Sequence, residues 1–159
     1  VAAALALAVY GPAEWGGHHA ILHGLRLGPV VGRRDGAVYE SHLAHHRAPD
    51  DLDLLFVRVD AVPKIVVAGA LGTVLVARRT TAPLTAMATL MSLMAGYHWV
   101  HYLMHAPYEG RGRWYRRLEA NHQLHHDQAS ESWRMGVLFM TADRALERAG
   151  VRPGSATRS

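Results

Sequence analysis

Twelve of the 159 residues are histidines, and their spacing is the feature that most constrains how this chain can fold. The motif H-x-x-H-H occurs twice, at His42, His45 and His46 and again at His122, His125 and His126. Residues three or four positions apart share one face of an α-helix. Each copy therefore predicts a helix that presents three imidazoles on one side.

The other six histidines form two further groups. One group comprises His98, His101 and His105, which are spaced i, i+3 and i+7 and predict a single stripe along a helix. The other comprises His18, His19 and His23, in which His19 and His23 are four apart and are expected to share a face of a regular helix. Four helix ends that carry such stripes can converge on one point.

A convergence of imidazoles predicts bound metal. A single histidine on a helix is usually a surface or hydrogen-bonded core residue. Two identical motifs and two further stripes, however, are improbable as a coincidence. Clustered imidazoles repel one another when protonated and need partners when buried and neutral. The chain has no cysteine, which excludes thiolate ligands and disulfides. A tetrahedral zinc takes four protein ligands, or three and a water, so ten or more histidines fit two ions. Imidazole suits zinc, copper, iron and nickel, and the identity of the metal stays open on this ground.

Two apolar stretches predict a helical hairpin. Residues 62–77 carry a charge only at Lys64, and residues 82–97 carry none. A helix of 16 residues is about 24 Å long, shorter than a hydrocarbon core of about 30 Å, whereas the second helix reaches about 36 Å if it continues to His105. Small residues along both stretches suit helix packing in membranes. We expect a membrane hairpin over about 62–104 with its tip at Arg78 and Arg79. The alternative is a buried hairpin in a soluble bundle.

Charge placement predicts the orientation in the membrane. The chain has 17 Lys+Arg against 13 Asp+Glu, and apart from the two tip arginines the basic residues lie in 26–64 and 111–158. An excess of basic residues marks the cytoplasmic side, so the histidines are expected there. Nucleic-acid binding predicts a basic face with readers beside it, and only short arginine clusters are present. The expected fold is an all-α membrane bundle with a cytosolic histidine-rich cap. It is expected to form one domain over 1–150, followed by a disordered tail over 151–159.

The combined motifs resemble one family. Glu14, His18 and His23 form E-x-x-x-H-x-x-x-x-H, His101 and His105 form H-x-x-x-H, and the two H-x-x-H-H motifs complete the set. Together they resemble the fatty acid hydroxylase / sterol desaturase superfamily, whose members are integral-membrane di-iron oxygenases. The resemblance runs from about residue 14 to 145. It includes the segments YRRLEANHQLHH and MGVLFMTADRAL, with an aspartate at the family's usual place.

The resemblance implies roles for the histidines. The ligands of two irons would be His18, His23, His42, His45, His46, His101, His105, His122, His125 and His126. His19 and His98 stand where relatives often carry an arginine and an acidic residue, so each is either an extra ligand or a supporting residue. Glu14 and Asp127 could orient the ligand imidazoles, as carboxylates near metal sites often do.

The resemblance also implies the chemistry. It predicts activation of O2 and hydroxylation or desaturation at a C–H bond of a lipid. Electrons would come from a separate electron-donor protein, because the chain has no flavin or nicotinamide fingerprint. A carotenoid or other isoprenoid hydroxylase is an alternative, although that branch typically has a shorter gap between the first two motifs. A non-catalytic membrane homologue that binds zinc is another.

Overall fold

The computed structural model is helical wherever it describes the chain. It describes residues 1–24, 36–56, 63, 67, 69–71, 74, 82–127 and 133–150. In order, these form α1 (Ala2–Gly17), the π-helical turn η1 (His18–Leu22), α2 (Ala37–Arg47), the 3₁₀ turn η2 (Leu52–Leu55), α4 (Ala82–His105), α5 (Arg113–Asp127) and α6 (Thr141–Arg148). No strand occurs in these ranges, which confirms the all-α fold. The helices expected around the two H-x-x-H-H motifs are confirmed as α2 and α5.

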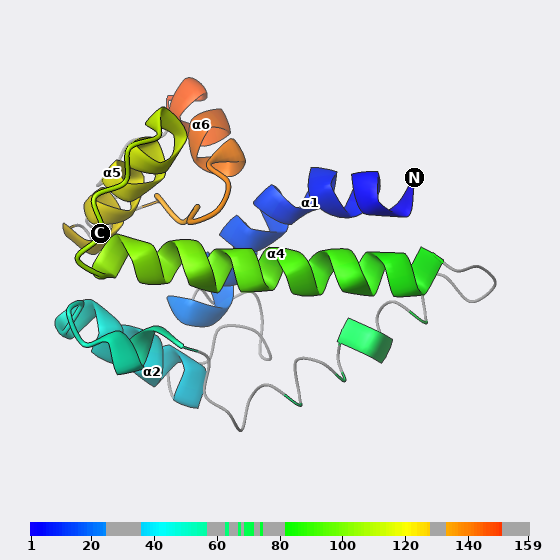
Figure 1. Ribbon diagram of the computed structural model, residues 1–159, viewed down its shortest axis with the longest axis horizontal. Helices are drawn as coiled ribbons and strands as arrows, with labels where there is room; N and C mark the ends of the chain where they lie inside the picture. Colours follow the sequence, from blue (N-terminus) through cyan, green and yellow to red (C-terminus); the bar gives the residue numbers. More distant parts are fainter. Residues whose placement is uncertain are drawn as a thin grey trace, which may run out of the picture.

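The longest helix, α4, runs along the long axis of the molecule (Figure 1). It has 24 residues and continues to His105 as expected. α1 packs on α4, α6 packs on α1, and α2 contacts both η1 and η2. α2, α5 and α6 all lie towards the end at which α4 finishes (Figure 1). The polar helices α2, α5 and α6 therefore surround the C-terminal end of α4.

The predicted hairpin is only partly visible. Most of residues 62–77, the tip at Arg78 and Arg79, and the tail over 151–159 lie outside the described residues. Among the helices that the structure does describe, none combines the length and the apolar character needed to cross a membrane.

A small apolar core lies beside the histidines. Its buried members are Tyr10 from α1, Val100 from α4, Leu118 from α5 and Leu138 from the segment before α6. Leu118 is fully buried, and it lies one helical turn before His122. Packing of this core therefore fixes the histidine-bearing faces of α4 and α5 relative to α1.

The irregular segment 133–140 is buried although it has no helix of its own to satisfy its backbone. The carboxylate of Asp143, which is 1% exposed, accepts hydrogen bonds from the backbone N–H groups of Met135 at 2.8 Å and Gly136 at 3.1 Å. Buried backbone groups without partners cost free energy, so the carboxylate replaces the missing helical bonds. Asp143 lies in the first turn of α6, where negative charge is also favourable.

We predict that Gly136→Ala destabilises the fold. An added Cβ would collide with the carbonyl oxygen of Phe139 and with the Asp143 carboxylate, both of which are held in place. Overpacking of this kind costs roughly 1–3 kcal/mol of unfolding free energy. The control is Gly16→Ala, because a Cβ there meets nothing within 4 Å and alanine favours the helix. Thermal unfolding of both variants checks this, and equal midpoints would contradict it.

Candidate metal centre

The first histidine group sits on a π-helical turn. In η1 the backbone N–H of His23 donates to the carbonyl of His18 at 3.1 Å, closing a ring over five residues. His18 and His23 therefore lie above one another, with their rings stacked at 5.2 Å between centroids. The ring of His19, four residues before His23, packs against Trp15 at 5.0 Å between centroids. Burial is the main cause of the lowered pKa of His23, and His19 still lies close enough to contribute to it. Such π turns inside helices are often found at functional sites.

The histidines gather into two groups. The α4 group comprises His45, His101, His105, His122 and His126. The α1 group comprises His18, His23, His42 and His125. Within each group, one ring nitrogen per residue lies within 4.8 Å of all the others. All nine residues are among the ten ligands that the sequence predicts.

The tenth predicted ligand, His46, lies between the groups. Its Nε2 is 3.0 Å from Nε2 of His42 in the α1 group. Its ring centroid is 4.4 Å from that of His126 in the α4 group. With His46 counted in the α1 group, each group holds five imidazoles, and the two groups adjoin. α2 and α5 contribute histidines to both.

Hydrogen bonds alone do not account for the α1 group. Nε2 of His42 lies 3.2 Å from Nε2 of His18, and 3.0 Å from the same atom of His23 and of His46. A neutral imidazole nitrogen either donates one proton or accepts with one lone pair, so it cannot bond three neighbours at once. A cation that accepts all of the lone pairs removes the conflict. The histidine groups can therefore bind metal.

The nitrogen spacing also bears on the coordination number. For metal–nitrogen bonds of about 2.0–2.1 Å, neighbouring ligand atoms are about 3.3–3.4 Å apart in a tetrahedron and about 2.8–3.0 Å apart in an octahedron. The close Nε2 pairs range from 2.8 Å for His105 and His122 to 3.2 Å for His23 and His125. These pairs are as close as neighbouring ligands of a five- or six-coordinate ion, and the other ligand nitrogens of each group lie within 4.8 Å of one another.

The imidazoles are held neutral. Burial lowers the pKa of His45 to about 4, with a further effect from His105, and that of His46 to about 3, with further effects from His23, His45 and His105. Burial likewise lowers the pKa of His23 to about 4. Metal binding requires the deprotonated ring, so these histidines are ready to ligate at neutral pH.

Two histidines of the α4 group bury nitrogens that have no partner. Both ring nitrogens of His45 and Nε2 of His101 are buried without a hydrogen bond in the described part of the chain. The side chains of His45 and His101 are only 1% and 3% exposed. A buried polar atom without a partner is costly. A cation at the centre of the α4 group supplies the missing interaction.

The four supporting residues that the sequence singles out lie outside both groups. His19 and His98 each bury an Nδ1 that has no hydrogen-bond partner among the described residues, and His98 lies one turn before His101 on α4. Asp127 is exposed at the end of α5. Glu14 is buried, but its carboxylate accepts backbone N–H groups, two at 2.7 Å on Oε1 and one at 3.2 Å on Oε2. Burial raises the pKa of Glu14 to about 7, although these bonds oppose the shift.

Glu14 thus ties α1 to the segment 133–140, since its three donors are Val137, Leu138 and Phe139. Trp15 adds a second tie, from its Nε1 to the carbonyl of Trp133 at 2.8 Å. Glu14 comes one helical turn before His18, so both contacts fix the end of α1 from which η1 begins.

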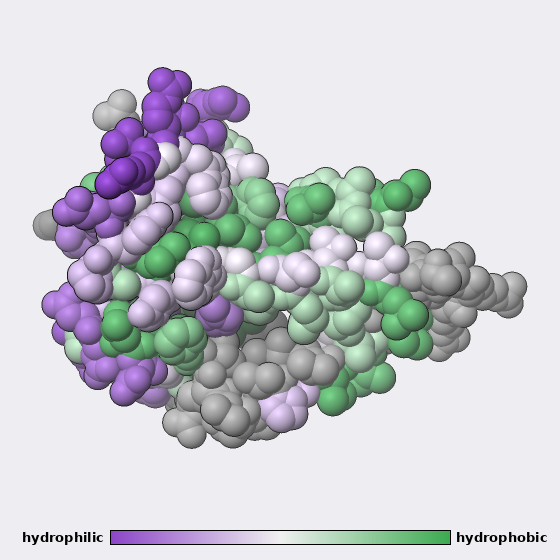
Figure 2. Space-filling model, in the orientation of Figure 1, coloured by the Kyte–Doolittle hydropathy of each residue, from purple (hydrophilic) through white to green (hydrophobic). Residues whose placement is uncertain are grey.

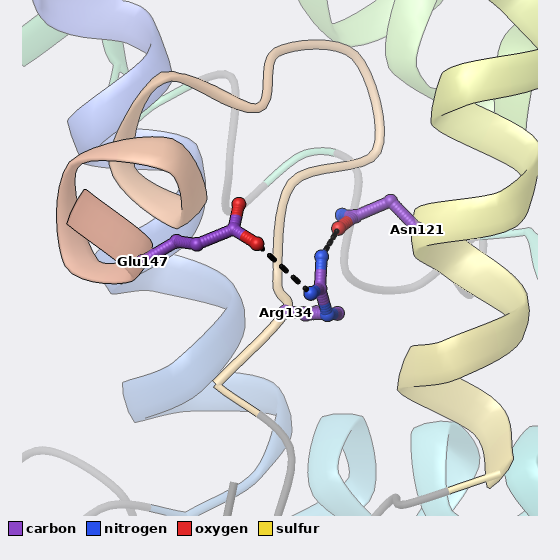
Figure 3. Close-up of polar contacts among 3 residues, drawn as sticks. All are labelled: Asn121, Arg134 and Glu147. Atoms are coloured by element: carbon purple, nitrogen blue, oxygen red, sulfur yellow. Dashed lines mark hydrogen bonds and ion pairs between the residues drawn. The ribbon is translucent and has the colours of Figure 1, made fainter. Parts of the chain in front are cut away.

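Sequence reasoning missed the corresponding tie on α5. Asn121 is buried, donates to the carbonyl of Gly136 at 3.1 Å and accepts from Arg134 at 2.9 Å (Figure 3). Arg134 also reaches Glu147 of α6 at 3.8 Å (Figure 3). Asn121 directly precedes His122, so the contact sets the position of a predicted ligand. The only signal in the sequence is an uncharged polar residue on the inner face of α5.

We predict that Glu14→Ala lowers both stability and metal content. The change leaves two buried backbone N–H groups and one partly buried one without an acceptor, at roughly 1–3 kcal/mol for each buried unsatisfied group. Loosening α1 also releases His18. Thermal unfolding and metal analysis of the purified variant check this. Glu14→Gln keeps one acceptor oxygen, so its stability and metal content should lie between those of the wild-type protein and of Glu14→Ala. A variant with wild-type stability and metal content would contradict the role.

We also predict that the protein stripped of metal loses stability as the pH falls below about 6.5. The folded-state pKa values of His23 and His45, about 4, lie below the value of about 6.5 in an unfolded chain. Between these values the unfolded state binds more protons, so stability declines over the window. Glu14 and Asp143, whose pKa values are raised by burial, act in the opposite direction, but they are two groups against several histidines. Denaturant unfolding at pH 7.5 and 5.5 checks this, and equal or greater stability at pH 5.5 would contradict it.

Comparison with known proteins agrees with this geometry. The model of the fatty acid hydroxylase family matches residues 3–147, which is most of the chain. Members of that family are generally oxidoreductases and are typically metal-dependent. No curated protein and no solved structure matches the chain. With both histidine groups inside the matched range, the chain belongs to the fatty acid hydroxylase family.

Proposed function

We propose that this protein is a membrane-bound di-iron oxygenase that hydroxylates or desaturates a C–H bond of a lipid. The observation that carries the proposal is the pair of adjoining groups, each with five neutral imidazoles at ligand spacing. Family membership supports a hydroxylase- or desaturase-type activity. The ten histidines are proposed as the ligands, five to each iron.

The ligand number favours iron over zinc. Structural zinc is almost always four-coordinate, and catalytic zinc keeps three protein ligands and one open position. Five imidazoles in the α4 group, with pairs as close as 2.8 Å, exceed that number. Five nitrogen ligands on an ion that accepts six leave one position open for a small molecule. Zinc bound without activity is the competing proposal.

The hydroxylation balances as R–H + O2 + 2 electrons + 2 H⁺ giving R–OH + H2O. When bound, the two irons supply the activation of O2 and the cleavage of the C–H bond. The chain would hold them in adjoining groups, because α2 and α5 place histidines in both. His46, which lies between the groups, would complete the five imidazoles of the α1 group. Burial of His45 and His125, each 1% exposed, excludes water from the ligand shell.

The surface supports a lipid substrate. Large apolar side chains are exposed on α1, on α4 and on the described positions between 63 and 74; they include Leu5, Leu7, Val9, Val67, Leu71, Val74 and Leu84. Figure 2 shows the apolar surface at one end of the molecule and the hydrophilic surface at the other. Exposed apolar patches of this kind mark interaction with membranes or proteins. We propose that the apolar end sits in the bilayer and the histidine end faces the cytoplasm.

We predict that His125→Ala abolishes hydroxylation and lowers bound metal, whereas His98→Ala keeps both metals and loses much of the turnover. His125 lies in the α1 group, 3.2 Å from His23, while His98 lies outside both groups. Metal analysis and O2 consumption with membrane lipid present check both variants.

Wild-type metal and activity in His125→Ala would contradict its role as a ligand. Loss of one full metal equivalent in His98→Ala would instead make His98 a ligand. Zinc without O2 consumption in the wild-type protein would favour the non-catalytic alternative.

A further inference from the structure

The start of α5 and the loop before it form an exposed basic patch. Its charged members are Arg111, Arg113, Arg116 and Arg117. Two large aromatic side chains lie among them, Tyr108 at 48% and Trp114 at 54% exposed. None of the four arginines makes an ion pair with any residue that the structure describes.

This charge works against the stability of α5. Basic side chains in the first turn of a helix face the positive end of its dipole, and the first turn of α5 has no acidic residue to compensate. Four like charges within seven residues also repel one another. Exposed aromatic residues add no core packing. These costs suggest a partner that neutralises the patch.

The patch lies close to the proposed irons. Arg116 and His122 are six residues apart on α5, or about 9 Å along the helix axis. Behind the patch, the ring of Tyr115 is buried and lies 5.4 Å from that of Tyr108. Fully buried Leu118 continues this inner face to His122. Buried residues Tyr115, Leu118 and His122 of α5 therefore line the side of the helix between the patch and the α4 group.

The patch also lies away from the apolar end. α5 is found at the end of the molecule opposite the start of α4 (Figure 1). That end is hydrophilic, whereas the exposed apolar side chains cover the other (Figure 2). A partner that approaches the patch comes from water. This placement favours a soluble acidic protein over anionic lipid headgroups.

We propose that the basic patch docks an acidic, soluble one-electron carrier protein. The inference rests on the proposed function, because hydroxylation consumes two electrons per O2. The carrier would deliver them one at a time, each carrier molecule being oxidised as one iron is reduced. Complementary charge steers such partners together, and contacts between redox proteins are commonly small and transient. Trp114 and Tyr108, both partly exposed beside the arginines in the sequence, would provide flat apolar contacts.

The test measures how fast the iron-loaded protein is reduced. We mix it anaerobically with a reduced, acidic plant-type [2Fe–2S] ferredoxin and follow oxidation of the ferredoxin. Arg113→Glu/Arg117→Glu should lower the second-order rate at least about tenfold at low salt. Arg144→Glu/Arg148→Glu, the matched control on α6, has the same spacing and charge change and should alter the rate less than about twofold. Reduction by dithionite should be equal in all three proteins.

Several outcomes overturn the proposal. Equal slowing in both variants would mean that net charge alone sets the rate. The patch would have no role as a carrier site if the ferredoxin fails to reduce a wild-type protein that dithionite reduces. If the α5 variant keeps its ferredoxin rate but loses binding to anionic phosphatidylglycerol vesicles, the patch binds lipid. If dithionite reduces no bound iron in the wild-type protein, the proposed function fails instead, which separates the two.

Discussion

Ten imidazole rings packed edge to face are stable together only if something neutralises the conflict among their nitrogens. Burial opposes protonation, because it lowers the pKa of buried rings such as those of His45 and His46. Geometry opposes hydrogen bonding, since Nε2 of His42 faces three other ring nitrogens. Bound cations would resolve both problems. The remainder of the described fold serves to bring α1, α2, α4 and α5 to this meeting point.

The supports of that meeting point are buried carboxylates. Glu14 and Asp143 between them accept the backbone N–H groups of residues 135–139, and Asn121 accepts from Arg134 while donating to Gly136. These bonds tie the irregular segment 133–140 to α1, α5 and α6. Such ties matter because metal ligands must be held close to their final positions before the ion binds.

The spacing rule for helices predicted α2, α4 and α5 well, because their histidines follow the regular period of three and four residues. At the first histidine group a π turn replaces that period, so that His18 and His23, five residues apart, lie together. Nothing in the local sequence specifies that turn. The targets of Glu14 could not be predicted either, since its donors lie more than 120 residues away along the chain. Helix-surface patterns are local, whereas the supporting contacts depend on tertiary packing.

The central proposal is that the two histidine groups bind two metal ions through their imidazole nitrogens. The most direct measurement is X-ray absorption at the iron edge on the purified, iron-loaded protein, together with metal analysis. We expect two irons per chain, each with about five nitrogen neighbours at a distance of about 2.1 Å, close to that of other metal–imidazole bonds. A single ion per chain, or four nitrogens in a tetrahedron around each ion, would contradict the account.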